Sequence, residues 1–311
     1  MRRGGSIDRR MSLRSASSVA VALTVLALAS GHARAAGGDS PGVRVEASLT
    51  SDDNVTRASG SDALSDGILG VRVNASATIP MSTHTRVVIQ GFAGTERFNT
   101  YSGLSRNFIG AQGDFKYRAS GEFGAATYGA FVRTAAEFYE SDLRDGYRHA
   151  FGVSVLKPWT DRIQLAGVLA WNITDGNSTV FDTKNVSVRG NADWSLTRSA
   201  VVYFGVEYRS GDVVSTVSRA DPLRTLGFVN TAAPNIVQDD AFTDTPRDAY
   251  RFKASTWLTS LGYNHAFGGG HSLDISWRWV QSSAQDPVAP ATASDLRYAV
   301  NQYSLAYLAR F

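Results

Sequence analysis

Polar and apolar side chains alternate along most of this chain, in twelve long segments. The run Asp114, Phe115, Lys116, Tyr117 and Arg118 is one example. Successive side chains of a β-strand point to opposite faces, so a period of two indicates strands. The segments are 42–50, 67–79, 86–98, 106–118, 123–138, 147–157, 162–174, 184–196, 200–210, 251–265, 272–282 and 297–311.

The length of these segments favours a membrane. Most run for 9–14 residues, whereas strands of soluble proteins centre on about 5–6 and tilted membrane strands need about 9–11. Lipid offers the backbone no hydrogen bonds, so a sheet in a membrane must close on itself. Full charges on the polar faces require a wet interior. We therefore predict an all-β fold: a transmembrane antiparallel up-and-down β-barrel of about twelve strands. The alternative is an exported soluble β-sandwich, with shorter strands and its polar face outside.

The connections between segments alternate in length. Every second one is short, as at 119–122 and 158–161, and the others are longer. Barrels of the bacterial outer membrane have short periplasmic turns and longer external loops. The sequence thus predicts that the longest connection, 211–250, is an external loop. Its apolar residues favour a loop that folds inward or caps the mouth, and an external hairpin extension is the other interpretation.

The N-terminus has the three parts of a secretory signal. Residues 2–14 are rich in Arg, residues 19–29 are apolar, and small residues follow at Ala33 and Ala35. The apolar stretch is shorter than the roughly 20 residues that a spanning helix needs. We expect residues 1–35 to be a signal peptide that is cleaved, leaving 36–311 as a single barrel domain in the bacterial outer membrane. A buried helix or a membrane anchor is the alternative.

Charge and composition exclude several functions. The net charge of +3 arises in the first 35 residues, where six Arg face one Asp, and the remainder carries a net charge of −2. A nucleic-acid partner is not expected, because phosphate binding needs a basic surface. The chain has no Cys, which excludes disulfide scaffolds, Cys-ligated metal sites and thiol catalysis.

Enzyme motifs are also missing. Barrel lipases carry His-x-Ser on one strand face and barrel proteases carry Asp-x-His, but none of the five His has either pattern. The metalloprotease, P-loop, EF-hand and nucleophile-elbow motifs are absent too, so we predict no enzyme activity, no cofactor and no metal. His149, on the sixth segment, is interpreted as a structural polar residue. The acidic pairs 52–53 and 239–240 are predicted to be solvated loop charges, with Ca²⁺ ligation as the alternative.

A barrel of twelve strands lies between filled eight-stranded barrels and open porins, so we expect a narrow passage whose charges set its selectivity. The inward positions comprise ten basic and seven acidic residues. This slight excess predicts a weak preference for anions, unless the charges pair across neighbouring strands and cancel. The predicted pore-lining residues are Arg72, Lys116, Arg118, Arg133, Glu137, Arg189, Asp193, Glu207, Arg209, Asp274 and Arg278.

The last residues, NQYSLAYLARF, place apolar side chains at every second position and end in Phe311. This pattern resembles the terminal strand by which bacterial outer-membrane proteins are recognised for insertion. The resemblance implies a porin-like protein, and it implies that the barrel assembly machinery binds this strand. Outer-membrane lipid and lipopolysaccharide would surround the barrel.

The run ASLTSDDNVTR at 47–57 resembles the start of the barrel domain in surface lipoprotein assembly modifiers. Those proteins carry helical repeats ahead of a barrel with more strands, and this chain shows no such repeats. Two functions therefore remain from the sequence. The first is a narrow water-filled channel for passive passage of small solutes, with a weak preference for anions. The alternative is a non-conducting structural barrel, or an assembly or export barrel, of the envelope.

Overall fold

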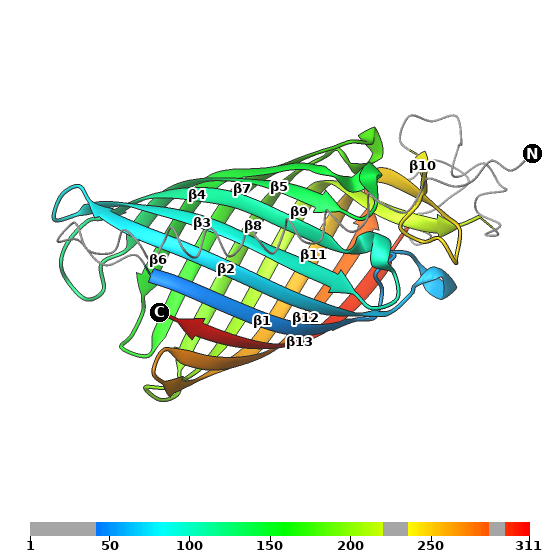
Figure 1. Cartoon of the computed structure of the whole chain (residues 1–311). Helices are drawn as coiled ribbons and strands as arrows, with labels where there is room; N and C mark the ends of the chain where they lie inside the picture. Colours follow the sequence, from blue (N-terminus) through cyan, green and yellow to red (C-terminus); the bar gives the residue numbers. More distant parts are fainter. Residues whose placement is uncertain (1–41, 220–235, 286–295) are drawn as a thin grey trace, which may run out of the picture.

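The chain forms a closed antiparallel β-barrel (Figure 1) in a computed structural model that describes residues 42–219, 236–285 and 296–311. Strands β1–β9 and β11–β13 pair in chain order, and β13 pairs with β1 to close a wall of twelve strands. The predicted fold class and strand number are confirmed. The predicted signal peptide, 1–35, lies outside the described residues.

The wall strands are long enough to cross a bilayer. Their bounds are β1 Gly42–Asp52, β2 Asp66–Pro80, β3 Thr85–Phe98, β4 Arg106–Arg118, β5 Thr127–Tyr139, β6 Gly146–Pro158, β7 Ile163–Gly176, β8 Thr183–Ser195, β9 Ala200–Ser218, β11 Arg247–Gly268, β12 His271–Ala284 and β13 Tyr298–Arg310. A short strand, β10 (Ile236–Asp239), pairs with β11 and with no other strand in the described part of the chain. The described parts of the connections contain four single-turn helices: η1 Gly60–Asp62, η2 Ser102–Leu104, η3 Asp142–Arg144 and η4 Thr179–Phe181. None of the helices within the described ranges has the length and hydropathy to span a membrane.

The two ends of the barrel differ, as the alternating connections predict. At one end, the short-turn end, Val43 and Phe311 exchange backbone hydrogen bonds of 3.3 and 2.9 Å, which joins the start of β1 to the C-terminus. Figure 1 shows the C-terminus at this end, and β10 with the helical turns at the other. We call the second end the long-loop end.

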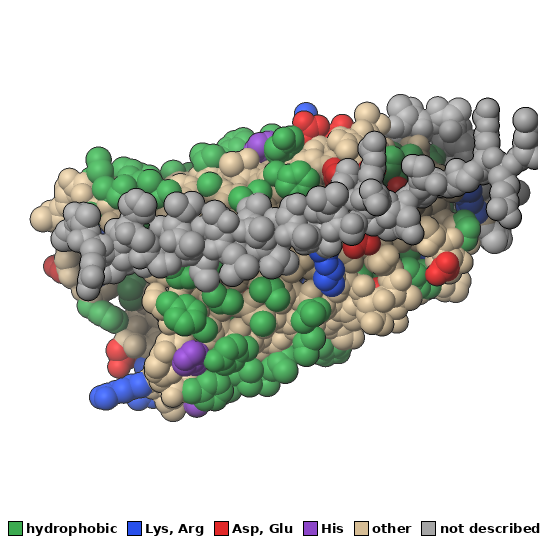
Figure 2. All heavy atoms as spheres, viewed as in Figure 1, with side chains coloured by type: hydrophobic (Ala, Val, Ile, Leu, Met, Phe, Trp, Pro, Cys, Tyr) green, Lys and Arg blue, Asp and Glu red, His purple; other side chains and the backbone are tan. Residues whose placement is uncertain are grey.

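Alternation along each strand separates an apolar outer face from a polar inner face. On β4, for example, Ile109, Phe115 and Tyr117 are exposed on the outside. Figure 2 shows apolar side chains spread over the outer wall. Such a surface is stable against hydrocarbon, and this is the reason for the period of two. The buried apolar clusters lie at the long-loop end, among the connections.

The connection between β9 and β11 is shorter than the predicted 211–250. Strand β9 continues to Ser218 and β11 begins at Arg247, so the two pair beyond Ala254, where the pairing of β11 with β12 stops. On this extension, three consecutive residues, 215–217, are buried. Both faces of the extension contact protein instead of lipid and water, so the period of two is lost there and the sequence does not reveal it.

Candidate functional site

The inner faces of the strands enclose a series of cavities along the barrel. One of 510 Å³ lies at the short-turn end, a central cavity of 590 Å³ follows, and one of 490 Å³ lies below the long-loop connections. Arg72 borders the first two, while Arg106 and Arg209 border the central and the long-loop cavities. Charged side chains therefore stand at both boundaries.

The residues predicted to line a pore all lie on the inward face of their strands. Arg118 is at the short-turn end, where Nη2 donates a hydrogen bond of 2.8 Å to the carbonyl of Glu122. Asp274 accepts a hydrogen bond of 2.8 Å from Tyr203, and Asp193 and Arg278 line a side cavity of 290 Å³. The central cavity brings together Arg72, Lys116, Arg133, Glu137, Arg189, Glu207 and Arg209.

Arg106 forms the centre of an ion-pair network on one wall of the central cavity. Its Nε and Nη2 donate to Glu96 at 2.9 and 3.0 Å, and its Nη1 donates to Glu137 at 2.9 Å. Arg148 donates to the second oxygen of Glu137 at 3.2 Å. The network joins strands β3 to β6, and bidentate pairs of this kind combine charge with fixed geometry.

Sequence reasoning missed both Arg106 and Arg148. Arg106 begins its strand, and Arg148 lies between Tyr147 and His149, so the local pattern does not assign a face. Parity along the strand supplies the missing signal, because Arg106 is an even number of residues from Asp114 and therefore shares its face.

A second network lies two strands further around the wall, on β8 and β9. Glu207 accepts hydrogen bonds from Arg189 at 2.8 and 2.5 Å and from Arg209 at 2.5 Å. Each of the three glutamates in the central cavity thus has at least one Arg partner. Pairing across strands, the alternative from the sequence, therefore does occur for the glutamates.

Pairing nevertheless leaves an excess of positive charge. Within the described residues, Arg72, Arg133 and Arg278 have no carboxylate oxygen within 4.0 Å. The side chains around the central cavity comprise eight cations and four carboxylates. The cations are Arg72, Arg86, Arg106, Lys116, Arg133, Arg148, Arg189 and Arg209, and the carboxylates are Glu96, Asp114, Glu137 and Glu207.

A hairpin formed by residues 236–250, the crossing hairpin, spans the long-loop end. Phe242 is buried against Leu104 and Tyr101, and the ring centroids of Phe242 and Tyr101 are 5.2 Å apart. Asp239 pairs with Arg144 and Asp240 with Ser141. These partners lie in the connections that flank β4 and β5, and β4 is six strands from β11 in either direction around the wall. The hairpin therefore reaches the opposite side of the barrel.

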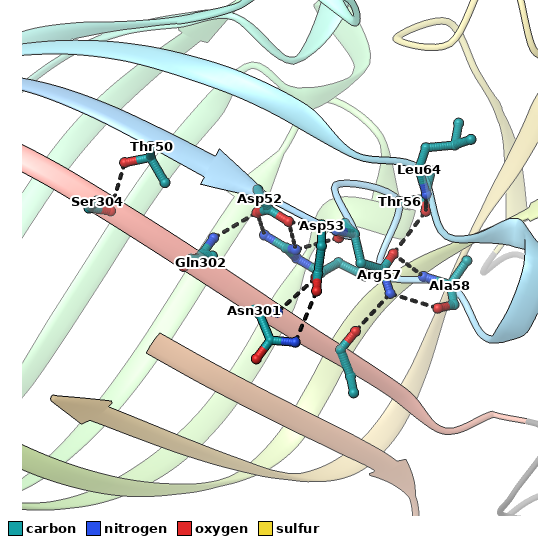
Figure 3. Close-up of polar contacts among 12 residues, drawn as sticks. Thr50, Asp52, Asp53, Thr56, Arg57, Ala58, Leu64, Asn301, Gln302 and Ser304 are labelled. Atoms are coloured by element: carbon teal, nitrogen blue, oxygen red, sulfur yellow. Dashed lines mark hydrogen bonds and ion pairs between the residues drawn. The ribbon is translucent and has the colours of Figure 1, made fainter. Parts of the chain in front are cut away.

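The connection between β1 and β2 packs on the extension of β9, at the same end of the barrel. The carbonyl of Thr56 accepts a hydrogen bond of 3.1 Å from the backbone N–H of Thr216, and the carbonyl of Arg57 accepts one of 2.6 Å from Ser215. Asp52 holds the turn by pairing with Arg57 at 2.7 Å (Figure 3). This turn accounts for the Asp, Asn and Arg of the run at 47–57.

One carboxylate of each acidic pair, at 52–53 and 239–240, differs from the prediction of solvated charge, while Asp53 and Asp240 are exposed as predicted. Asp52 and Asp239 are at most 2% exposed, and each is paired with an Arg. Asp53 binds the backbone and side chain of Asn301 (Figure 3). Within the described ranges, no three His, Asp or Glu side chains come together in a way that would hold a metal ion. Loops cover Asp52 and Asp239 from water, so these two carboxylates connect one loop to another.

Arg247, at the base of the crossing hairpin, is almost completely buried, and its closest carboxylate is Asp62 at 3.8 Å. Burial lowers the pKa of Arg247, whereas the charges of Asp62 and Asp239 act to raise it. Arginine stays charged at neutral pH even so. The hairpin therefore carries a buried cation between two acidic residues.

Histidines of the wall point away from the cavities. His149 stacks on Tyr147 with ring centroids 6.4 Å apart, on the outer face of β6. His271 stacks on Tyr307, whose hydroxyl lies 2.8 Å from Nδ1. Outward His–Tyr pairs of this kind fit the polar–apolar boundary of a membrane, and neither His reaches the charged networks.

Solved structures of other barrels resemble this one. An outer-membrane channel from Pseudomonas putida F1 has a TM-score of 0.54 at 12% identity, covering 90% of this chain and 98% of that one. The chain has the fold of a bacterial outer-membrane β-barrel. The KdgM porin, with a TM-score of 0.41 and 8% identity over 86% of this chain and 99% of that one, is also similar. So is the translocator domain of the autotransporter NalP from Neisseria meningitidis, with a TM-score of 0.42 and 12% identity over 96% and 98%. The sequence matches no protein-family model and no curated protein.

Proposed function

We propose that the barrel is a narrow channel for passive passage of small solutes across the outer membrane, with a preference for anions. The long-loop end would face the exterior, as in other barrels of this fold. The observation that carries the proposal is the central cavity, where paired glutamates leave an excess of positive charge. A ring of fixed charge in a narrow wet passage raises the local concentration of the opposite ion.

The predicted pore-lining residues have two roles in this proposal. Glu137 and Glu207 hold arginines in position, and the unpaired Arg72, Arg133 and Arg278 supply the field. Arg118, Lys116, Asp193 and Asp274 lie along the same inner face. Chemistry on the solute is not part of the proposal, and the barrel would act without enzyme activity.

A salt gradient across a planar bilayer tests the anion preference. With concentrated KCl on one side, the reversal potential is expected to have the sign of chloride permeation. Arg278→Gln removes an unpaired charge and should shift the potential toward zero by several millivolts, because fewer fixed cations face the passage. Arg198→Gln, on an exposed turn, removes the same charge outside the barrel and should leave the potential unchanged. A wild-type potential with the sign of potassium would contradict the preference.

The alternative is a non-conducting barrel of the envelope, and the buried crossing hairpin favours it. Liposome swelling with sugars of graded size separates the two functions. Swelling by small sugars that falls with increasing size supports the channel, and the absence of swelling with every sugar supports the closed barrel.

The partners that we propose follow from the C-terminal strand and the outer wall. Phe311 is 77% exposed while its backbone closes the seam, so the residue is accessible to the barrel assembly machinery. Outer-membrane lipid and lipopolysaccharide would contact the apolar wall.

A further inference from the structure

Two arginines of the central cavity share one aromatic ring. The guanidinium carbon of Arg72 lies 4.8 Å from the centroid of Phe92, and that of Arg133 lies 4.5 Å from the same centroid. The ring is only 3% exposed. It lies over Gly110 of β4, where a Cβ atom would overlap it. Because Gly110 has no side chain, the ring of Phe92 can lie there, between Arg72 on β2 and Arg133 on β5.

The ring holds these guanidiniums without neutralising them. Cation–π attraction fixes a guanidinium over an aromatic face, but the ring carries no negative charge. In the described part of the chain, Arg72 donates from Nε to Asn74 at 2.9 Å, and the guanidinium of Arg133 donates no hydrogen bond. The glutamates nearby are already occupied: Glu137 binds Arg106 and Arg148. The edges of both guanidiniums that face the cavity are therefore available to a ligand.

The pair also stands where a solute would pass. Arg72 borders both the cavity at the short-turn end and the central cavity. Arg133 lines the central cavity, whose volume of 590 Å³ accommodates a small organic solute. A solute moving between the two cavities would therefore meet Arg72, with Arg133 beside it on the same ring.

We propose that Arg72 and Arg133, mounted on Phe92, form a binding site for small dicarboxylates. Each planar guanidinium matches one carboxylate by two parallel N–H···O bonds. Two such groups on one ring favour a solute with two carboxylates over one with a single negative charge. The site rests on the proposed function, because passage is what brings the solute to it, and it adds the class of solute.

Binding is measured directly on the full-length protein folded in detergent, by calorimetric titration with succinate. Succinamide, which has the same shape without charge, is the control ligand. We expect succinate to bind and succinamide to give no heat. Arg72→Gln or Arg133→Gln should each weaken succinate binding by about tenfold, which is the value of one charge-assisted pair. Arg162→Gln, on an exposed turn, removes the same charge and should leave binding unchanged.

Lysine variants keep both the charge and the fold. Arg72→Lys and Arg133→Lys should still weaken succinate binding, because an ammonium cannot form the two parallel bonds. Equal affinity in the lysine variants would overturn the bidentate site. Inorganic phosphate is titrated in parallel, and tighter binding of phosphate than of succinate would overturn the assignment to dicarboxylates.

The same protein in planar bilayers separates this inference from the proposed function. If the protein conducts anions selectively, but its affinity for succinate is the same in the Arg72 and Arg133 variants as in the wild type, the site alone is overturned. If both glutamine variants lose succinate binding, and neither the wild type nor any variant conducts, the site is supported and the channel is overturned.

Discussion

Replacing residues 236–246 with a Gly–Ser segment of equal length is expected to raise the single-channel conductance severalfold. The crossing hairpin reaches the connection after β3 and buries Phe242 there. It also carries Asp239 and Asp240 onto the connection between β5 and β6. Removing these contacts frees the long-loop end, and the conductance of a pore rises with its open cross-section. Single-channel recording in KCl measures the effect.

A matched replacement of residues 119–124, an exposed turn at the short-turn end, serves as the control and should leave the conductance unchanged. Phe242→Ala is the milder variant. Loss of a buried Phe costs about 3–5 kcal/mol of packing, so the hairpin should detach part of the time and produce large, intermittent openings. Wild-type conductance in the replaced protein would show that the hairpin does not constrict the passage.

Arg106→Ala is expected to destabilise the barrel and to shift its selectivity toward cations. Arg106 is mostly buried and pairs with both Glu96 and Glu137. Removing one partner from a buried pair costs about 3–5 kcal/mol, because the remaining charge stays uncompensated. The variant also loses one cation from the central cavity. Urea unfolding of the protein in lipid vesicles measures the stability, and the reversal potential measures the selectivity.

The triple variant Arg106→Met with Glu96→Gln and Glu137→Gln tests whether uncompensated charge causes the loss of stability in Arg106→Ala. It removes both carboxylates along with the cation, so most of the stability should return. The cavity then carries one more net positive charge than in the wild type, so the preference for anions should exceed the wild-type value. If Arg106→Ala and the triple variant are equally unstable, uncompensated charge is not the cause of the loss.

The wall of the barrel is largely predictable from the sequence, because lipid on one side and water on the other impose a strict period of two. The segment 106–118 corresponds to β4 residue for residue. Strand β9 is longer than its alternating pattern, since the predicted segment ends at residue 210 and the strand ends at Ser218. Beyond the wall, both faces of β9 contact loops, and burial on both faces has no periodic signal.

The charged interior is predictable by face but not by partner. Alternation places Glu207 and Arg189 on one face, yet only the register of β8 against β9 brings them opposite each other. The crossing hairpin was less accessible to sequence reasoning. Its contacts join Phe242 to Leu104 and Asp239 to Arg144, and such distant pairs depend on the closed barrel rather than on local pattern.

The crossing hairpin also constrains the order of biogenesis. Its contacts come from hairpins early in the chain, such as the connection at Leu104, and from a segment close to the last strands. These segments can meet only after all of them have been translocated to the same side of the bilayer. Packing around Phe242 is therefore a late event, completed when β13 has paired with β1. Protection of this region from protease would indicate a completely folded barrel.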